Sequence, residues 1–391
     1  MKKNNYYDII TKEVNIMKFL HTSDLHLGKK LYEYSLIDDQ SYILAKIIEI
    51  AKENNVDALL ISGDIYDHGI PSVEAQNLFE AFLLDLQKNS ITTFIIKGNH
   101  DSNRLGYAKK FISAYNIFIN EDLNNALTPV IYKDVNFYLL PFFNIYNARY
   151  VFPDEKITSI EEAYKLIIEK MQLDKKKINV LLAHDVFLPS EKGLQLGGSE
   201  SVETGVGGLQ RVGVNILHDF DYVALGHIHK PQTVYKNKVR YSGSPLKYSD
   251  KEAEIEKSVT IVNINPEKQV TLDIVPLTPV RDLVKVRGTA AELLQQTISD
   301  KYVAIELADK SPIVNAMSRL RVNYPYIINL FYKNIQKNTN IASLSKHNLD
   351  NLNPEELFDN FFQTQNGRAM SNEERDAINK IFISISEGAE S

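Results

Sequence analysis

The residues best suited to chemistry are histidines, aspartates and an asparagine that recur in five short polar motifs over the first two thirds of the chain. In chain order, the motifs supply Asp24 and His26; Asp64 and Asp67; Asn99, His100 and Asp101; His184; and His227 and His229. Imidazole nitrogens, carboxylates and an amide oxygen, without thiolates, favour divalent ions such as Mn²⁺, Fe²⁺ or Zn²⁺. The residue types therefore predict a metal centre.

The number of these side chains indicates how many ions they hold. The motif histidines other than His100, together with Asp24, Asp64 and Asn99, make seven good ligands. Seven are too many for one ion with open positions, but they suit two ions that share a bridging carboxylate. Two ions ~3.5–4 Å apart hold an attacking hydroxide and stabilise charge on a phosphoryl group. His100 adjoins Asn99 without having to be a ligand, so it is available to the substrate as an acid or charge stabiliser. One such motif alone is usually a turn or a helix cap, but five of the nine histidines lie in these motifs.

Each motif follows an apolar run, which indicates the elements that must position it. Short continuous apolar runs followed by glycine, such as residues 58–61 and 94–96, predict strands buried on both faces. Apolar residues at helical spacing lie between the runs, as at Ile43, Leu44 and Ile47. Strand and helix alternate, so the sequence predicts a layered α/β domain. Ligands in such domains bind beyond the carboxyl ends of the strands, where all five motifs would meet.

Composition restricts the class of protein further. The chain has 391 residues, 44% of them hydrophobic and 24% charged, as in an ordinary globular protein. It contains no cysteine, which excludes disulfides, Cys-ligated zinc and thiol chemistry and fits a reducing, cytoplasmic environment. We expect no membrane span, because no apolar run approaches the ~18 residues that one needs. The polar residues 1–16 are expected to form an N-terminal extension rather than a signal peptide.

The net charge of −6 limits how the chain could act on nucleic acid. Proteins that bind DNA through their overall field are usually basic. Action on DNA would therefore require bound cations, a local basic patch or a partner.

The five motifs, "DLH", "GDIYD", "GNHD", "AHD" and "GHIH", resemble in sequence and order those of the calcineurin-like metallophosphoesterases. The stretches "YVALGHIHKPQ" and "YSGSPLKYS" resemble the SbcD nuclease branch of that superfamily more narrowly. The resemblance runs from about residue 17 to about residue 248 and continues more weakly to the C-terminus. It implies an α/β fold: a metallophosphoesterase domain with two central β-sheets flanked by helices, then a smaller α+β capping domain and C-terminal helices.

The resemblance also implies roles for individual residues. One ion is assigned Asp24, His26, Asp64 and His229, with Asp64 bridging, and the other is completed by Asn99, His184 and His227. His100 corresponds to the catalytic histidine of the family, and Asp67 and Asp101 to groups that orient ligands. The implied cofactors are two divalent ions, with Mn²⁺ expected. Basic residues that follow the motifs are candidate contacts to DNA phosphates: Arg104, Lys230 and Lys247.

Changes of pattern predict the domain organisation. After the extension we expect a nuclease domain at 17–264, an α+β capping domain at 265–333, a polar linker at 334–352 and a helical segment at 353–391. The last helix opens with a predicted capping box, Ser371 to Glu374. The apolar faces of this segment favour binding to a groove of a partner, for which the family suggests an SbcC-type ATPase related to SMC proteins.

The resulting hypothesis is a two-metal DNA nuclease in an ATP-dependent SbcCD-type complex. Family expectation is 3′–5′ exonuclease activity on double-strand ends and endonuclease activity on single strands or hairpins, in DNA repair, replication and recombination, by a homodimer within a heterotetramer. The alternative is a metallophosphoesterase for another ester, such as a cyclic-nucleotide phosphodiesterase or a phosphatase. The sequence "GNHD" in place of "GNHE" weighs against a protein phosphatase. A non-enzymatic scaffold is a third interpretation, disfavoured because every predicted ligand is present.

Overall fold

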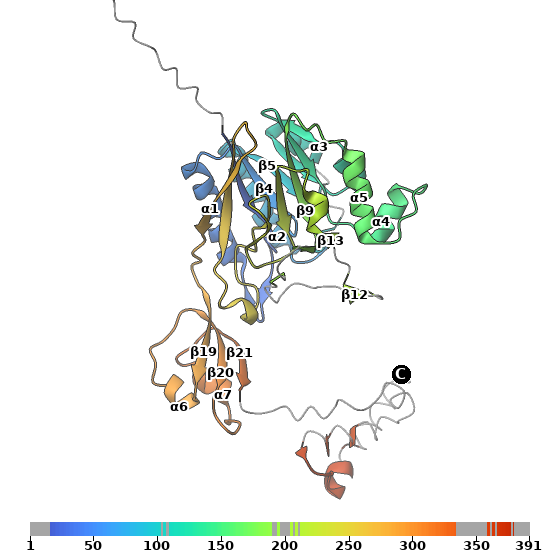
Figure 1. The fold of residues 1–391 in the computed structure, drawn as a ribbon. Coiled ribbons are helices and arrows are strands. Elements are labelled where there is room, and N and C mark those ends of the chain that lie inside the picture. The colour runs from blue at the N-terminus through green and yellow to red at the C-terminus, as the bar shows by residue number, and fades with distance from the viewer. Residues whose placement is uncertain are drawn as a thin grey trace, which may run out of the picture. The chain divides into compact units, whose positions relative to one another are not determined.

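A computed structural model describes most of the chain (Figure 1). The described residues are 16–102, 105–106, 109–189, 194–195, 204–205, 208–209, 212–333, 358–359, 362–363, 366–376 and 378.

Two six-stranded sheets form the body of the protein. The first has the order β18-β17-β1-β4-β5-β6, in which β1, β4, β5 and β6 run parallel and β17 lies antiparallel to β1. Its strands are β1 (Met17–Thr22), β4 (Ala58–Ser62), β5 (Thr92–Ile96), β6 (Ile117–Asn120), β17 (Ser258–Ile264) and β18 (Val270–Pro276).

The second sheet has the order β15-β16-β14-β9-β8-β7, with four parallel strands between two antiparallel edge strands. Its strands are β7 (Val130–Tyr132), β8 (Val135–Leu139), β9 (Ile178–His184), β14 (Tyr222–Gly226), β15 (Gln232–Tyr235) and β16 (Val239–Tyr241). Short ladders accompany the sheets: β2 (Lys30–Leu31) with β3 (Tyr34–Ser35), β10 (Phe187–Leu188) with β13 (Val212–Gly213), and β11 (Thr204–Gly205) with β12 (Gly208–Leu209).

The inner faces of the two sheets pack against each other through a buried apolar layer. Phe19, Phe94 and Phe137 lie at its centre, and the rings of Phe94 and Phe137 stack with their centroids 4.0 Å apart. Strands in this position are buried on both faces, which is why they read as continuous apolar runs.

Helices cover the outer faces (Figure 1). The helices α1 (Ile37–Glu53) and α2 (Val73–Lys88) share a buried cluster with the first sheet, and α4 (Ile145–Val151) and α5 (Ile160–Met171) share one with the second. The predicted apolar face of α1 is buried, and Ser72 and Ser159 cap α2 and α5 through their side chains. The layered α/β fold with two central sheets is thus confirmed. The shorter helices here are α3 (Lys109–Ile112), η1 (Ser113–Tyr115), η2 (Leu123–Leu127), η3 (Val214–Leu217) and η4 (Asp250–Glu252).

A three-stranded sheet, in the order β19-β20-β21, follows. Its elements are β19 (Leu283–Gly288), α6 (Ala290–Leu293), β20 (Tyr302–Leu307), α7 (Ala316–Leu320) and β21 (Ile327–Tyr332). By compactness the chain divides into two units, one of 1–286, 296–305 and 317–330, the other of 287–295, 306–316 and 331–391. The predicted boundary at 265 differs from the sheet pattern, because β18 pairs along its length with β17 in the first sheet.

The predicted linker at 334–352 lies outside the described residues, as does most of the helical segment at 353–391. Within the described part, residues 372–376 are helical. The Glu374 amide donates to the Ser371 hydroxyl at 3.2 Å, and the Ser371 amide donates to the Glu374 carboxylate at 2.8 Å. The predicted capping box is therefore confirmed. Among the helices that the structure describes, none is long and apolar enough to cross a membrane.

Candidate metal centre

The predicted ligands come together at the carboxyl ends of five strands, three from the first sheet and two from the second. Asp24 and His26 follow β1, Asp64 follows β4, and Asn99 follows β5, whereas His184 ends β9 and His227 and His229 follow β14. The two sheets face each other with these ends on the same side, so residues up to 205 positions apart converge. All seven side chains except that of Asn99 belong to buried residues.

One group of ligands surrounds His26. Ligand atoms of Asp24, His26 and His229 lie within 4.8 Å of one another, and the Nε2 atoms of the two histidines are 3.1 Å apart. Two imidazole nitrogens at this distance, beside a carboxylate, are placed to share one ion.

A second group surrounds His184. Its Nε2 lies 2.9 Å from Asn99 Oδ1, and the same amide oxygen lies 3.0 Å from His227 Nδ1. Asp64 joins the two groups, because its Oδ2 is 3.5 Å from His26 Nε2 and 3.4 Å from His184 Nε2. This is the position that a bridging carboxylate takes.

The donor set fits a pair of divalent ions. Seven oxygen and nitrogen donors, three of them carboxylate or amide groups, converge in a buried space without any thiolate. Asp24, His26, Asp64 and His229 would hold one ion, and Asp64, Asn99, His184 and His227 the other.

Four of these seven residues have backbone angles in the left-handed region. The φ angles are 54° at Asp24, 44° at His26, 49° at Asp64 and 92° at His227. Aspartate and histidine tolerate this region better than most residues, but it still costs free energy and persists only where neighbouring contacts enforce it. The turns after β1 and β4 supply such contacts, because the Asp24 amide donates to Gly63 O and the His26 amide to Asp64 O, each at 3.0 Å.

A buried glutamine, which the sequence analysis did not single out, supports the first of these turns. Gln40 Nε2 donates to the carbonyls of Leu25 and His26 at 3.2 and 2.7 Å, and Gln40 Oε1 accepts from the Gly28 amide at 3.0 Å. Tyr248 lies against the same turn: its hydroxyl donates to Leu25 O, and its ring packs edge-on against His26. Gln40 is on α1, and nothing in its surroundings in the sequence marks it.

Asp101 ties two of the motifs together. Its carboxylate accepts from the amides of Ile65 and Tyr66, in the turn after β4, and from the Gly98 amide, at 2.9–3.0 Å. Gly98 has no room for a side chain, because a Cβ there would lie 2.1 Å from Asp64 Oδ1. The glycine that ends the apolar run of β5 is therefore required by the close approach of Asp64.

His100 lies beside the ligands but is held differently. Its Nδ1 lies 2.8 Å from the carbonyl oxygen of Asp67, so Nδ1 carries a proton and donates it there. The His100 amide donates to Asp64 Oδ1 at 2.9 Å. The residue is half-buried, whereas the histidines predicted as ligands are buried. Asp67 Oδ1 also lies 3.4 Å from His26 Nδ1 and accepts from Lys29 Nζ at 2.7 Å, which suits a group that orients the His26 ring.

In the absence of a metal ion, burial and neighbouring charges shift the pKa values of two histidines in this site. Burial alone would lower the pKa of His184, but the Asp64 carboxylate beside Nε2 raises it to about 10. Burial, followed by the nearby His184, lowers the pKa of His227 to about 3. A metal ion held by His184 would require the neutral imidazole, so its binding would release the proton of His184.

The three basic residues predicted to contact DNA phosphates have different surroundings. Arg104 lies outside the described residues. Lys230 is half-buried and its Nζ donates to the side-chain oxygen of Gln195. Lys247 Nζ donates to the carbonyls of Ala253 and Leu283 at 2.8 and 3.0 Å and forms an ion pair with Asp282, which is typical of a structural lysine.

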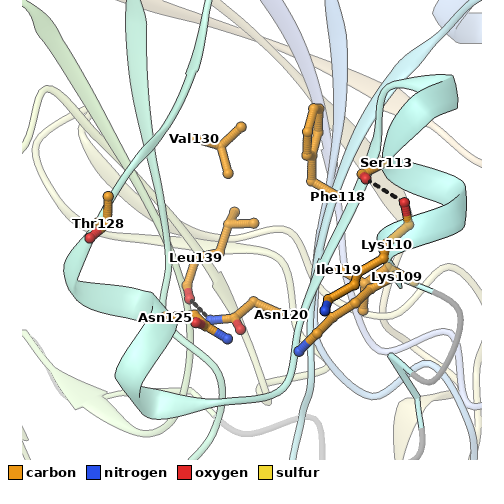
Figure 2. Close-up of a pocket in the computed structure, with 10 residues that line it drawn as sticks. All are labelled: Lys109, Lys110, Ser113, Phe118, Ile119, Asn120, Asn125, Thr128, Val130 and Leu139. Carbon is orange, nitrogen blue, oxygen red and sulfur yellow. Dashed lines mark hydrogen bonds between the residues drawn. The ribbon is translucent and has the colours of Figure 1, made fainter.

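A pocket of about 220 Å³ lies away from the predicted ligands, between β6, α3 and the β7–β8 hairpin (Figure 2). Phe118, Val130 and Leu139 contribute its apolar wall, and Lys109 and Lys110 its charged rim. None of its lining residues is a predicted ligand or a motif residue.

Comparison with known families agrees with this site. Residues 17–231 match the family described as Calcineurin-like phosphoesterase, and residues 279–366 match the one described as Type 5 capsule protein repressor C-terminal domain. The first match covers more than half of the chain. The chain belongs to the calcineurin-like phosphoesterase family and is thus a metal-dependent hydrolase of phosphate esters.

Individual relatives identify the branch of the family to which the chain belongs. The chain is 33% identical over 385 residues to the D subunit of nuclease SbcCD from Staphylococcus saprophyticus, covering 95% of this chain and 99% of that protein. It is 31% identical over 377 residues to the protein of the same name from Staphylococcus epidermidis, covering 94% and 99%. These relatives place the chain in the SbcD branch of the family. Among solved structures, TT1561 of Thermus thermophilus aligns with 66% of this chain and 99% of its own, with a TM-score of 0.37 and 12% identity.

Proposed function

We propose that this protein is a two-metal DNA nuclease, the nuclease subunit of an SbcCD-type complex. The observation that carries the proposal is the position of Asp64, whose Oδ2 lies within 3.5 Å of one imidazole from each sheet. The relatives are named as the D subunit of nuclease SbcCD, which supports DNA as the substrate.

The chain's own residues perform three tasks in this mechanism. Bound divalent ions supply Lewis acidity toward the phosphoryl group and lower the pKa of water. Asp24, Asp64, Asn99 and the ligand histidines hold and orient the ions. His100 meets the substrate: Nδ1–H donates to the Asp67 carbonyl, and Nε2, when it also carries a proton, donates that proton to the departing sugar oxygen and is left as the neutral nitrogen. The Asp67 carboxylate orients the His26 ring, and Asp101 fixes the turns that carry the ligands.

The finer features of the proposal follow from the resemblance. Mn²⁺ is the expected ion, and the activities are 3′–5′ exonuclease action on double-strand ends and endonuclease action on single strands and hairpins. An SbcC-type ATPase binds the C-terminal segment and contributes phosphate contacts, which offsets the chain's net charge of −6. The complex, a homodimer of this chain with two ATPase subunits, acts in DNA repair, replication and recombination in the cytoplasm.

The substitution His100→Asn tests the mechanism. We expect two Mn²⁺ ions to bind as in the wild type, measured by calorimetric titration, while cleavage of a DNA hairpin falls by roughly 10²–10⁴-fold. His218→Asn is a matched control, because His218 Nδ1 also lies 2.8 Å from a backbone carbonyl, that of Asn215, but on the surface.

Loss of a metal ion in the His100 variant, or retention of cleavage, would show that His100 does not have this role. Turnover of a cyclic nucleotide or a phosphate monoester by the wild type, without cleavage of DNA in the presence or absence of the ATPase, would instead favour the phosphoesterase alternative.

A further inference from the structure

We infer that Glu252 and Lys257 form a buried ion pair that positions the imidazole of His229 for metal binding. The inference rests on the proposed metal centre and adds to it two residues that lie outside its motifs.

The contacts form a continuous chain. Glu252 Oε1 lies 3.2 Å from His229 Nδ1, and Glu252 Oε2 accepts from Lys257 Nζ at 2.5 Å. Lys257 Nζ also donates to the backbone carbonyl of His229 at 2.9 Å and to the hydroxyl of Ser244 at 2.8 Å. Lys257 thus holds two groups in place: the Glu252 carboxylate, which contacts the His229 ring, and the backbone carbonyl of His229 itself.

The pair is almost completely buried. Glu252 is 0% exposed and Lys257 5% exposed. Taking two charges out of water is costly, and a buried pair usually adds little net stability compared with apolar residues of similar size. A role in stability alone therefore explains this arrangement poorly, whereas a role in fixing the orientation of a neighbouring ligand explains each of its contacts.

The sheet topology delivers the pair to the site. Strand β17 runs antiparallel to β1, with Thr260 opposite His21, so the start of β17 lies beside the end of β1, where Asp24 follows. Lys257 directly precedes β17, and Glu252 ends the η4 turn just before it. Both residues therefore reach the metal edge of the sheet although they are distant in sequence from Asp24.

The contacts determine which ring nitrogen faces the ion. A carboxylate oxygen accepts hydrogen bonds only, so Glu252 selects the form of His229 that has its proton on Nδ1. The lone pair is then on Nε2, the atom that lies 3.1 Å from His26 Nε2 within the first ligand group. Groups that orient metal-bound histidines in this way commonly contribute 10–100-fold to metal affinity.

Two double variants that differ at one position test the inference. Glu252→Met with Lys257→Met removes both charges and the acceptor for Nδ1, while preserving volume and leaving no unpaired buried charge. Glu252→Gln with Lys257→Met also removes both charges but keeps a carbonyl oxygen that can accept from Nδ1.

We expect the Met/Met protein to bind one of its two Mn²⁺ ions about 10–100-fold more weakly in calorimetric titration and the other normally. The Gln/Met protein should recover most of the loss. A control pair lies at the opposite end of β14, where Lys268 Nζ is 3.1 Å from Asp221 Oδ2. Asp221→Asn with Lys268→Met should leave both Mn²⁺ affinities within about twofold of the wild type, a difference of about 0.4 kcal/mol.

Equal Mn²⁺ affinities in the Met/Met, Gln/Met and wild-type proteins would overturn the inference, as would equally weakened affinities in the two double variants, because the acceptor at Nδ1 would then be irrelevant. Circular dichroism of the metal-free proteins ensures that folded chains are compared. A wild type that binds fewer than two ions would instead refute the proposed metal centre, which separates the two failures.

Discussion

The turn that carries Asp24 and His26 depends on one buried side chain, and Gln40→Met tests how much. Methionine is close to glutamine in length and volume, so the substitution leaves the packing of α1 intact and removes only the amide. It eliminates the three hydrogen bonds that Gln40 makes with the backbone of residues 25–28.

The expected cost follows from what each backbone group retains. The Leu25 carbonyl keeps the Tyr248 hydroxyl as a donor, and the His26 carbonyl keeps the Lys29 amide at 3.0 Å. Only the Gly28 amide loses its acceptor. Two lost bonds of about 1 kcal/mol each, with an unsatisfied amide of about 1–2 kcal/mol at this half-buried position, give a loss of about 3–4 kcal/mol.

The assay is urea unfolding of the EDTA-treated protein, monitored by circular dichroism, together with Mn²⁺ titration of the folded variant. We expect the lower stability and a Mn²⁺ affinity reduced at least tenfold, since the turn can relax from its left-handed φ angles and displace two ligands. Gln76→Met is the control, because the Gln76 amide donates to Pro71 O at an exposed site, and we expect its effect to stay within about 0.5 kcal/mol.

A change below about 1 kcal/mol for Gln40→Met, with unchanged Mn²⁺ affinity, would refute the reasoning. It would mean that the contacts between the turns after β1 and β4 hold Asp24 and His26 without help from α1.

Three further predictions concern the same domain. Gly98→Ala should abolish binding of two Mn²⁺ ions, because its Cβ would lie 2.1 Å from Asp64 Oδ1, whereas Gly213→Ala, with nothing within 4 Å, should bind both; equal binding by the two variants would argue against the close packing. Burial, with the nearby Arg240, lowers the pKa of His21 to about 3, so below pH ~6.5 the unfolded chain takes up a proton that the folded chain does not. As the pH is lowered from ~6.5 to ~3, the unfolding free energy should therefore fall by up to about 1.4 kcal/mol per pH unit. His21→Gln should make this dependence on pH shallower. An unchanged slope in the variant would exclude His21 as its source. Addition of EDTA should lower the urea midpoint, since each ion present at 100 times its dissociation constant contributes about 2.7 kcal/mol, and a midpoint independent of Mn²⁺ would contradict a metal centre coupled to folding.

The parts of the site that could be predicted from the sequence are those that a local pattern determines. Continuous apolar runs indicated the buried strands, and a polar motif after each run placed its side chains at one edge of the sheets. The capping box at Ser371 and Glu374 was predictable for the same reason, because both partners lie within one helical turn.

The supporting residues could not be predicted in this way, because their role depends on register between distant strands. Glu252 and Lys257 reach His229 only because β17 pairs with β1, and Gln40 reaches the first turn only because α1 packs over it. The expected boundary at 265 differs from the strand pairing for a related reason: β18 alternates apolar and polar residues like any half-buried strand, and its sequence does not reveal that its partner is β17.

Because the proposed ligands extend from Asp24 to His229, with the first four on one sheet and the last three on the other, no fragment of the chain that lacks either sheet contains a complete site for either ion. A chain still emerging from the ribosome would present unpaired histidines and carboxylates until its last strands had joined the first. Only a chain long enough to include both sheets would then hold both ions, so a product that ends before β14 would lack the proposed hydrolytic activity.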